Sequence, residues 1–122
     1  MSRKILVVED NKDLARLLDL HLRDLSYDVD LAFDGDTGWV QISKNSYDLI
    51  ILYLMLPGID GLEFLRLAKI CQTGSLRMLI TAYRDEGIVS ELTAMGIHRY
   101  IEKPFSVESL AESLAMLTRN HQ

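Results

Sequence analysis

Short, dense apolar runs alternate with amphipathic stretches along the chain, and this alternation restricts the folds that it can adopt. The runs are rich in Ile, Leu and Val, are too short for helices and do not alternate with polar residues; they cover residues 5–8, 49–52, 78–80 and 100–101, with a weaker run at 29–33. Such runs are typical of strands covered on both faces, as in a parallel sheet. We therefore expect five parallel strands.

The stretches between the runs carry apolar residues at helical spacing. Three stripes can be followed, formed by Leu14, Leu18, Leu22 and Leu25, by Val107, Leu110, Leu114 and Leu117, and by Ile88, Leu92 and Met95. Asn11, Asp60 and Ser106 stand where helix N-caps are expected. The strand–helix unit thus repeats five times without a linker. This predicts a single α/β domain over residues 1–122, a doubly wound, five-stranded parallel sheet sandwiched by five helices, (βα)5.

Composition narrows the class of protein. With 122 residues, the chain is long enough for one core, since chains of this size bury roughly two-thirds of their unfolded surface. The 13 Lys and Arg residues against 18 Asp and Glu residues give a net charge of −5, so we expect no direct binding of nucleic acid. The longest apolar stretch, residues 49–57, is far shorter than the ~20 residues that span a bilayer. We expect a cytoplasmic protein without membrane contact.

Polar side chains follow the expected strands. Glu9 and Asp10 end the first strand, Tyr53 the third, Thr81 the fourth and Lys103 the fifth. Functional groups of parallel sheets gather at these carboxyl ends, and two adjacent carboxylates there need Mg²⁺, Lys103 or both to offset their repulsion. The alternative is that Glu9 and Asp10 only begin a helix, whose N-terminus favours negative charge. Together with the Thr81 hydroxyl and the Lys103 ammonium, the carboxylates favour a phosphoryl-binding site.

Four motifs, in this order and spacing, resemble the receiver domain of two-component response regulators, single-domain chemotaxis regulators included. They are VVEDN (7–11), DLIILYLMLPGIDG (48–61), LITA (79–82) and YIEKPF (100–105). The resemblance covers residues 1 to about 116 and implies a flavodoxin-like fold.

The resemblance also implies roles for individual residues. Glu9 and Asp10 match the acidic pair that binds Mg²⁺, and the backbone carbonyl of Met55 matches a further ligand. Thr81 and Lys103 match the positions that contact the phosphoryl group.

One position departs from the family pattern. Where the family carries the aspartate that accepts the phosphoryl group from a histidine kinase, this chain has Tyr53. A phenol with a pKa near ~10 is neutral at neutral pH, so the site loses one of three carboxylates and a direct metal ligand. We expect an affinity for Mg²⁺ well below that of an ordinary receiver. Asp48 cannot take over, because it opens the third strand, ~16 Å from the site.

The sequence leaves two explanations for Tyr53: a natural pseudo-receiver that signals without phosphotransfer, or an engineered replacement in an ordinary receiver. By resemblance, the partners are a histidine kinase or phosphotransfer protein, and an output domain or partner protein bound through the face of the fourth helix, fifth strand and fifth helix. Tyr100 matches the aromatic switch residue that couples the site to this face, and a homodimer is also consistent with the family. The chain is either a stand-alone regulator or a domain excised from a longer protein.

Two other functions stay open. A phosphoryl-transfer enzyme, such as a phosphatase with an aspartate nucleophile, would need Asp-x-Asp after the first strand, where residues 9–13 read Glu-Asp-Asn-Lys-Asp. A flavodoxin-like cofactor binder would need a loop rich in Ser, Thr and Gly there, and the acidic run would repel a phosphate. We therefore expect a binding module and no enzyme.

Overall fold

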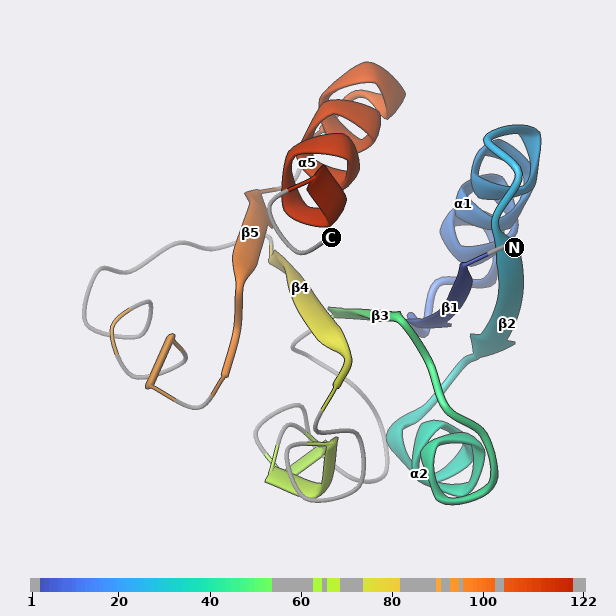
Figure 1. The fold of residues 1–122 in the computed structure, drawn as a ribbon. Coiled ribbons are helices and arrows are strands. Elements are labelled where there is room, and N and C mark those ends of the chain that lie inside the picture. The colour runs from blue at the N-terminus through green and yellow to red at the C-terminus, as the bar shows by residue number, and fades with distance from the viewer. Residues whose placement is uncertain are drawn as a thin grey trace.

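The five expected strands form one parallel sheet in the computed structural model (Figure 1). Their bounds are β1 (Lys4–Val8), β2 (Asp28–Ala32), β3 (Leu49–Tyr53), β4 (Leu76–Thr81) and β5 (Arg99–Glu102). They lie in the order β2-β1-β3-β4-β5, so the chain leaves β1 toward one side of the sheet and returns at β3 on the other. This is the flavodoxin-like order, in which the carboxyl ends of β1 and β3 border a crevice.

The structure describes residues 3–53, 63–64, 66–68, 74–81, 90, 93–94, 96–102 and 105–119. Three helices are complete within these ranges: α1 (Lys12–Asp24), α2 (Gly35–Lys44) and α5 (Val107–Arg119). Residues 63–64, 66–68, 90 and 93–94 are also helical, in the segments where the third and fourth helices are expected. Asp60, Ile88, Leu92 and Met95, on which those two predictions partly depend, lie outside the described residues.

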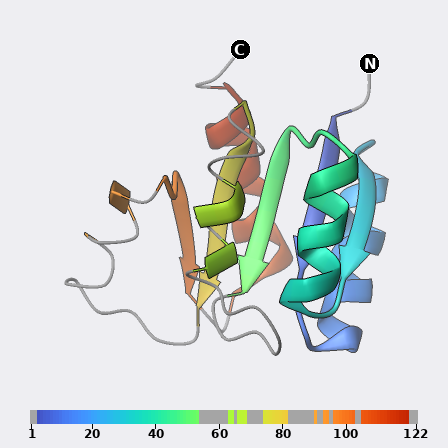
Figure 2. The same ribbon diagram turned by 90° about the horizontal axis from the view of Figure 1, so that it is seen from below.

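The helices cover both faces of the sheet, as the sequence predicts. Helices α1 and α5 lie on one face, and α2 lies on the other together with the helical residues near 63–68 (Figures 1 and 2). Because successive strand residues point to opposite faces, two apolar clusters result. One contains Ile5, Val7, Ile51, Met78 and Ile80 with Leu18, Leu22, Leu110 and Leu114 of α1 and α5; the other contains Leu6, Val8, Ile50, Leu52 and Leu79 with Ile42, Phe64 and Ala68.

Helix starts follow from side-chain caps. The Asn11 Oδ1 atom accepts a hydrogen bond from the Leu14 N–H at 3.0 Å, and the Ser106 Oγ atom accepts one from the Ser109 N–H at 3.0 Å, which confirms both predicted N-caps. Asp34 is a third cap, which the sequence analysis missed, and accepts from the Thr37 N–H at 2.6 Å. The hydrogen bonds from Thr37 lower the pKa of the Asp34 carboxyl.

Leu25 corrects one detail of the predicted α1 stripe. Ala15, Leu18 and Leu22 are the buried residues of α1, whereas Leu25 is the C-cap and is 51% exposed. Leu25 donates its own N–H to the carbonyls of His21 and Leu22 as the helix ends. The last residue of the predicted stripe, Leu25, therefore lies at the surface and not in the core.

Arg77 places a charge inside the sheet. It lies on β4 and is only 5% exposed. Its Nη2 and Nη1 atoms donate to the carbonyls of Ala68 and Gly96, both at 3.3 Å. Burial lowers the pKa of the Arg77 guanidinium. Arg77 thus ties two distant helical segments to the sheet, since Ala68 and Gly96 follow residues 66–67 and 93–94 in those segments.

No helix among the described residues is both long enough and apolar enough to cross a membrane.

Candidate functional site

The carboxyl ends of β1, β3 and β4 meet at one edge of the sheet. Val8 pairs with Leu52, so Glu9 follows β1 at the level where Tyr53 ends β3. Tyr53 in turn pairs with Ile80, which brings the backbone of Thr81 to the same edge. The predicted convergence of Glu9, Tyr53 and Thr81 is therefore present in the backbone.

Glu9 and Asp10 are neighbours in the chain but occupy different environments. Glu9 is fully buried, its N–H donates to the Ala32 carbonyl at 3.0 Å, and its Oε2 accepts from the Asn11 N–H at 3.1 Å. Asp10 is exposed. Glu9 thus supports the start of α1, as the simpler interpretation predicts, and both carboxylates still lie at the edge where a cation site is expected.

Lys12 and Phe33 add a feature that the sequence analysis missed. The Lys12 ammonium lies over the Phe33 ring, 5.4 Å from its centre. Cation–π contacts of this kind hold an ammonium beside an aromatic face. Lys12 begins α1 and Phe33 directly follows β2, so the pair borders the acidic edge on the β2 side. The two residues are 21 positions apart in the sequence. They meet only because β1 and β2 lie side by side in the sheet, so spacing in the sequence does not predict the contact.

The remaining predicted site residues are described unevenly. Met55 and Lys103 lie outside the described residues, so their roles stay predictions. Asp48 lies at the opposite end of the sheet, where its Oδ2 accepts from the Lys4 N–H at 2.8 Å. Among the described residues, no three His, Cys, Asp or Glu side chains are grouped to hold a metal ion.

Tyr100 lies on β5 with its ring half-buried against the second apolar cluster. Its hydroxyl is 3.2 Å from the Thr93 Oγ1 atom, which joins β5 to the helical residues 93–94. The predicted switch residue therefore contacts the segment that precedes β5.

The model of the response regulator receiver domain family matches residues 5–115. The chain belongs to this family. As a receiver domain of a two-component response regulator, it is a signalling protein, and its five-stranded parallel sheet is the receiver fold.

Relatives of this receiver include response regulator ArlR of Staphylococcus saprophyticus, which is 44% identical over 98% of this chain and 54% of ArlR. The receiver thus spans about half the length of the curated relatives that it matches. The receiver domain of the Francisella response regulator 1452 has a TM-score of 0.89 at 26% identity, over 99% of this chain and 100% of that one.

A third relative bears on metal binding. The receiver domain of sensor histidine kinase PA1611 from Pseudomonas aeruginosa has a TM-score of 0.83 at 28% identity, over 95% of this chain and 97% of that one. It was solved with a magnesium ion coordinated in its active-site cleft.

Proposed function

We propose that this receiver signals without accepting a phosphoryl group. The observation that carries the proposal is Tyr53, which ends β3 at the sheet edge where the family places its phosphoacceptor aspartate. An acyl phosphate forms when a carboxylate oxygen attacks phosphorus and the donor leaves. A neutral phenol at this position offers no carboxylate, so that bond does not form.

Glu9, Asp10, Thr81 and Lys103 keep the residue types of a phosphoryl site. In the proposed site, Glu9, Asp10 and the carbonyl of Met55 would hold Mg²⁺, which supplies positive charge against phosphoryl oxygens. The donor set fits Mg²⁺ incompletely, because Tyr53 removes one carboxylate from the group. The magnesium that the PA1611 receiver binds is therefore expected here only with reduced affinity.

Without an acyl phosphate, Thr81 has no phosphoryl group to move toward. We infer that signalling depends on partner binding or on a fixed conformation of the face that contains β5, α5 and the segment around residues 90–94. In this proposal, the contact between Tyr100 and Thr93 changes when the conformation of this face changes. A histidine kinase or phosphotransfer protein, an output domain and a second copy are the proposed partners of a cytoplasmic module that catalyses no reaction itself.

The Tyr53→Asp variant tests this function. Wild-type chain and variant are incubated with acetyl phosphate and Mg²⁺, and the phosphorylated fraction is measured by intact mass spectrometry. We expect phosphorylation of Tyr53→Asp, sensitive to hydroxylamine as an acyl phosphate is, and none of the wild type.

Adding Asp10→Asn to Tyr53→Asp provides the matched control, since it removes one predicted metal ligand and should lower the phosphorylated fraction. Phosphorylation of the wild type to the same extent as Tyr53→Asp would contradict the proposal. An inert Tyr53→Asp variant would show that the site differs from an ordinary receiver at further positions.

A further inference from the structure

Strand β2 forms an open edge of the sheet. It comes first in the strand order, and no described element lies beyond it (Figures 1 and 2). Successive residues of a strand direct their N–H and C=O groups alternately to its two sides. The Asp28 N–H donates to the Arg3 carbonyl on the β1 side at 2.9 Å, and the Ala32 carbonyl accepts from that side. The backbone groups of Val29 and Leu31 therefore point outward, where an added strand could pair with them.

One of these outward groups is covered by a side chain. Arg23, in the last turn of α1, donates from Nη2 to the Val29 carbonyl at 2.8 Å and from Nε to the Asp19 Oδ1 atom at 2.6 Å. The planar guanidinium makes both bonds in one orientation, so Asp19 holds it in place. Strands that pair lie about 4.8 Å apart. The guanidinium thus occupies the space that the backbone of an added strand would need at Val29.

The turn between α1 and β2 fixes the position of Arg23. The Tyr27 N–H donates to the Leu22 carbonyl at 3.1 Å. The Ser26 N–H donates to the Arg23 carbonyl at 2.9 Å. These are the two hydrogen bonds of a Schellman ending, in which the residue after the C-cap is left-handed, and Ser26 has a φ of 72°. Because this turn is short, the last turn of α1 lies beside the start of β2.

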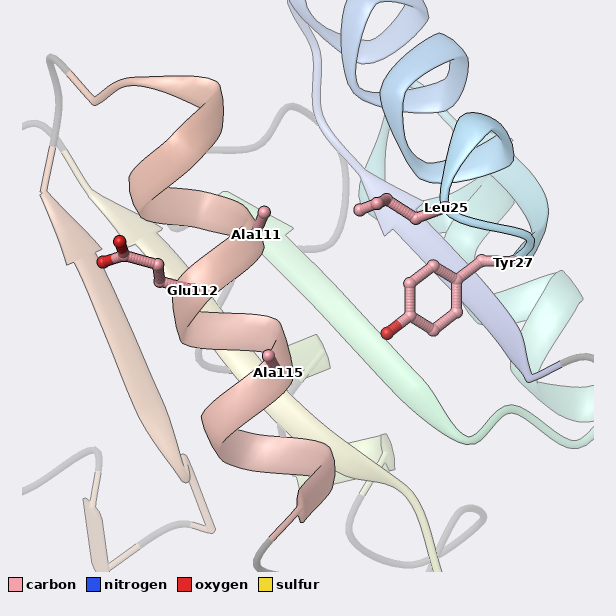
Figure 3. Close-up of a pocket in the computed structure, with 5 residues that line it drawn as sticks. All are labelled: Leu25, Tyr27, Ala111, Glu112 and Ala115. Carbon is pink, nitrogen blue, oxygen red and sulfur yellow. The ribbon is translucent and has the colours of Figure 1, made fainter.

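The apolar side chains at the end of α1 do not cover the edge. Leu25 and Tyr27 extend toward α5, where they line a shallow pocket together with Ala111, Glu112 and Ala115 (Figure 3). Tyr27 also packs against the apolar cluster on this face of the sheet. Among the described residues, Arg23 is the one side chain that bonds to an outward backbone group of β2.

We propose that Arg23, held by Asp19, guards this edge against pairing with β2 of a second copy of the chain. About a two-fold axis at Asp30, the two strands would run antiparallel, and Val29 of each copy would exchange main-chain hydrogen bonds with Leu31 of the other. The Val29 carbonyl is an acceptor in that ladder, and Arg23 occupies it. The guard leaves association of the chain to its other surfaces.

Charge contributes less to this protection than Arg23 does. The same axis would bring the two Asp30 side chains opposite each other, where like charges repel. The Asp30 Oδ2 atom already accepts from the Tyr47 hydroxyl at 2.8 Å and lies 3.6 Å from the Lys4 Nζ atom, which offsets part of its charge. Removal of Arg23 alone should therefore open the edge.

The Arg23→Ala variant tests the guard in sedimentation equilibrium of the full chain. We expect it to associate beyond the state of the wild type, at concentrations at least about tenfold lower. Arg16→Ala is the matched control: Arg16 is exposed on α1 about two turns before Arg23, and within the described ranges it forms no hydrogen bond with β2. Both variants carry the same net charge, and the control should behave as the wild type.

Amide hydrogen exchange of Leu31, measured by NMR over a series of protein concentrations, shows where the contact forms. In Arg23→Ala, exchange at the outward Leu31 N–H should slow at least about tenfold as the chain associates, whereas a mere loss of stability would speed it. In the wild type and in Arg16→Ala it should not depend on concentration.

An Arg23→Ala variant that keeps the association state of the wild type at millimolar concentration would overturn the proposal. So would association of this variant without slower exchange at Leu31, because the contact would then lie elsewhere, or exchange at Leu31 that slows with concentration in the wild type. None of these measurements involves Tyr53, Mg²⁺ or phosphate, so they fail or succeed independently of the proposed function.

Discussion

Arg77 illustrates how this sheet accommodates a charge. Burying a guanidinium costs free energy unless its donors find acceptors, and here Nη1 and Nη2 donate to the carbonyls of Gly96 and Ala68. The buried Nε atom has no hydrogen-bond partner among the described residues. Arg77 is also bonded to His98, directly before β5: the Arg77 N–H donates to the His98 Nδ1 atom at 3.0 Å, and the His98 N–H donates to the Arg77 carbonyl at 2.9 Å.

Replacing Arg77 should be costly. Arg77→Met keeps much of the apolar stem but leaves the Ala68 and Gly96 carbonyls without their charged donor, so we expect the free energy of unfolding to fall by about 2–3 kcal/mol. Urea unfolding monitored by circular dichroism measures it. Arg66→Met is the matched control, since Arg66 is exposed and pairs only at the surface with Glu63, and should change stability by less than about 0.5 kcal/mol. Equal losses in both variants would contradict this role of Arg77.

The burial and the contacts of several individual residues could not be predicted from the sequence of this chain. Glu9 and Asp10 read alike in the sequence, yet only Glu9 is buried, because it directly continues β1 into the core. Arg77 gave no sequence signal, since its acceptors lie 9 and 19 residues away. The Lys12–Phe33 contact was missed for the same reason. Contacts between residues that are distant in the chain depend on the assembled sheet.

At the scale of elements, local signals suffice for much of the fold. The apolar runs predicted all five strands to within a few residues at each end, because strands covered on both faces are mostly apolar. Asn11 and Ser106 predicted two helix starts through their own hydrogen-bonding chemistry. Asp34 was missed because α2 carries Gly35 and Gly38 and only a weak apolar stripe, which conceals the start of the helix.

The two caps Asp34 and Asn11 should differ in their dependence on pH. Replacing either by Ala removes a cap and should lower the free energy of unfolding by about 1 kcal/mol at neutral pH. The pKa of Asp34 is lower in the folded chain, so its contribution is complete above the ordinary carboxyl pKa and is lost as the pH falls through the folded value. Asn11 does not titrate, so its contribution should not change over that range.

Urea unfolding of Asp34→Ala, Asn11→Ala and the wild type, in steps from pH 7 to about pH 3, measures the difference. The cost of Asp34→Ala should shrink below the ordinary carboxyl pKa of 3.8, while that of Asn11→Ala stays level. A cost of Asp34→Ala that is constant with pH would exclude the charged cap.

At the scale of the whole molecule, the sheet order decides where chemistry can occur. The order β2-β1-β3-β4-β5 brings the ends of β1, β3 and β4 together, so a single residue at position 53 stands between the acidic pair and Thr81. This edge is predictable from the sequence because the carboxyl ends of parallel strands lie at the same edge of the sheet. The placement of α1 and α5 on one face of the sheet depends instead on how helices distant in the sequence pack together.

The structure shows where some of the acidic residues behind the net charge of −5 lie. Two of the 18 acidic residues, Glu9 and Asp10, lie at the candidate functional edge, and an aspartate at position 53 would bring the chain to −6. We propose that this missing carboxylate separates this receiver from one that accepts a phosphoryl group.

The missing carboxylate is tested most directly by calorimetric titration of Mg²⁺ into the wild type, Tyr53→Asp and Tyr53→Asn. Asn resembles Asp in size but lacks its charge, so it separates the loss of the carboxylate from the bulk of the phenol. We expect Tyr53→Asp to bind Mg²⁺ at least about tenfold more tightly than both the wild type and Tyr53→Asn. Wild-type binding as tight as that of Tyr53→Asp would contradict the interpretation of this site.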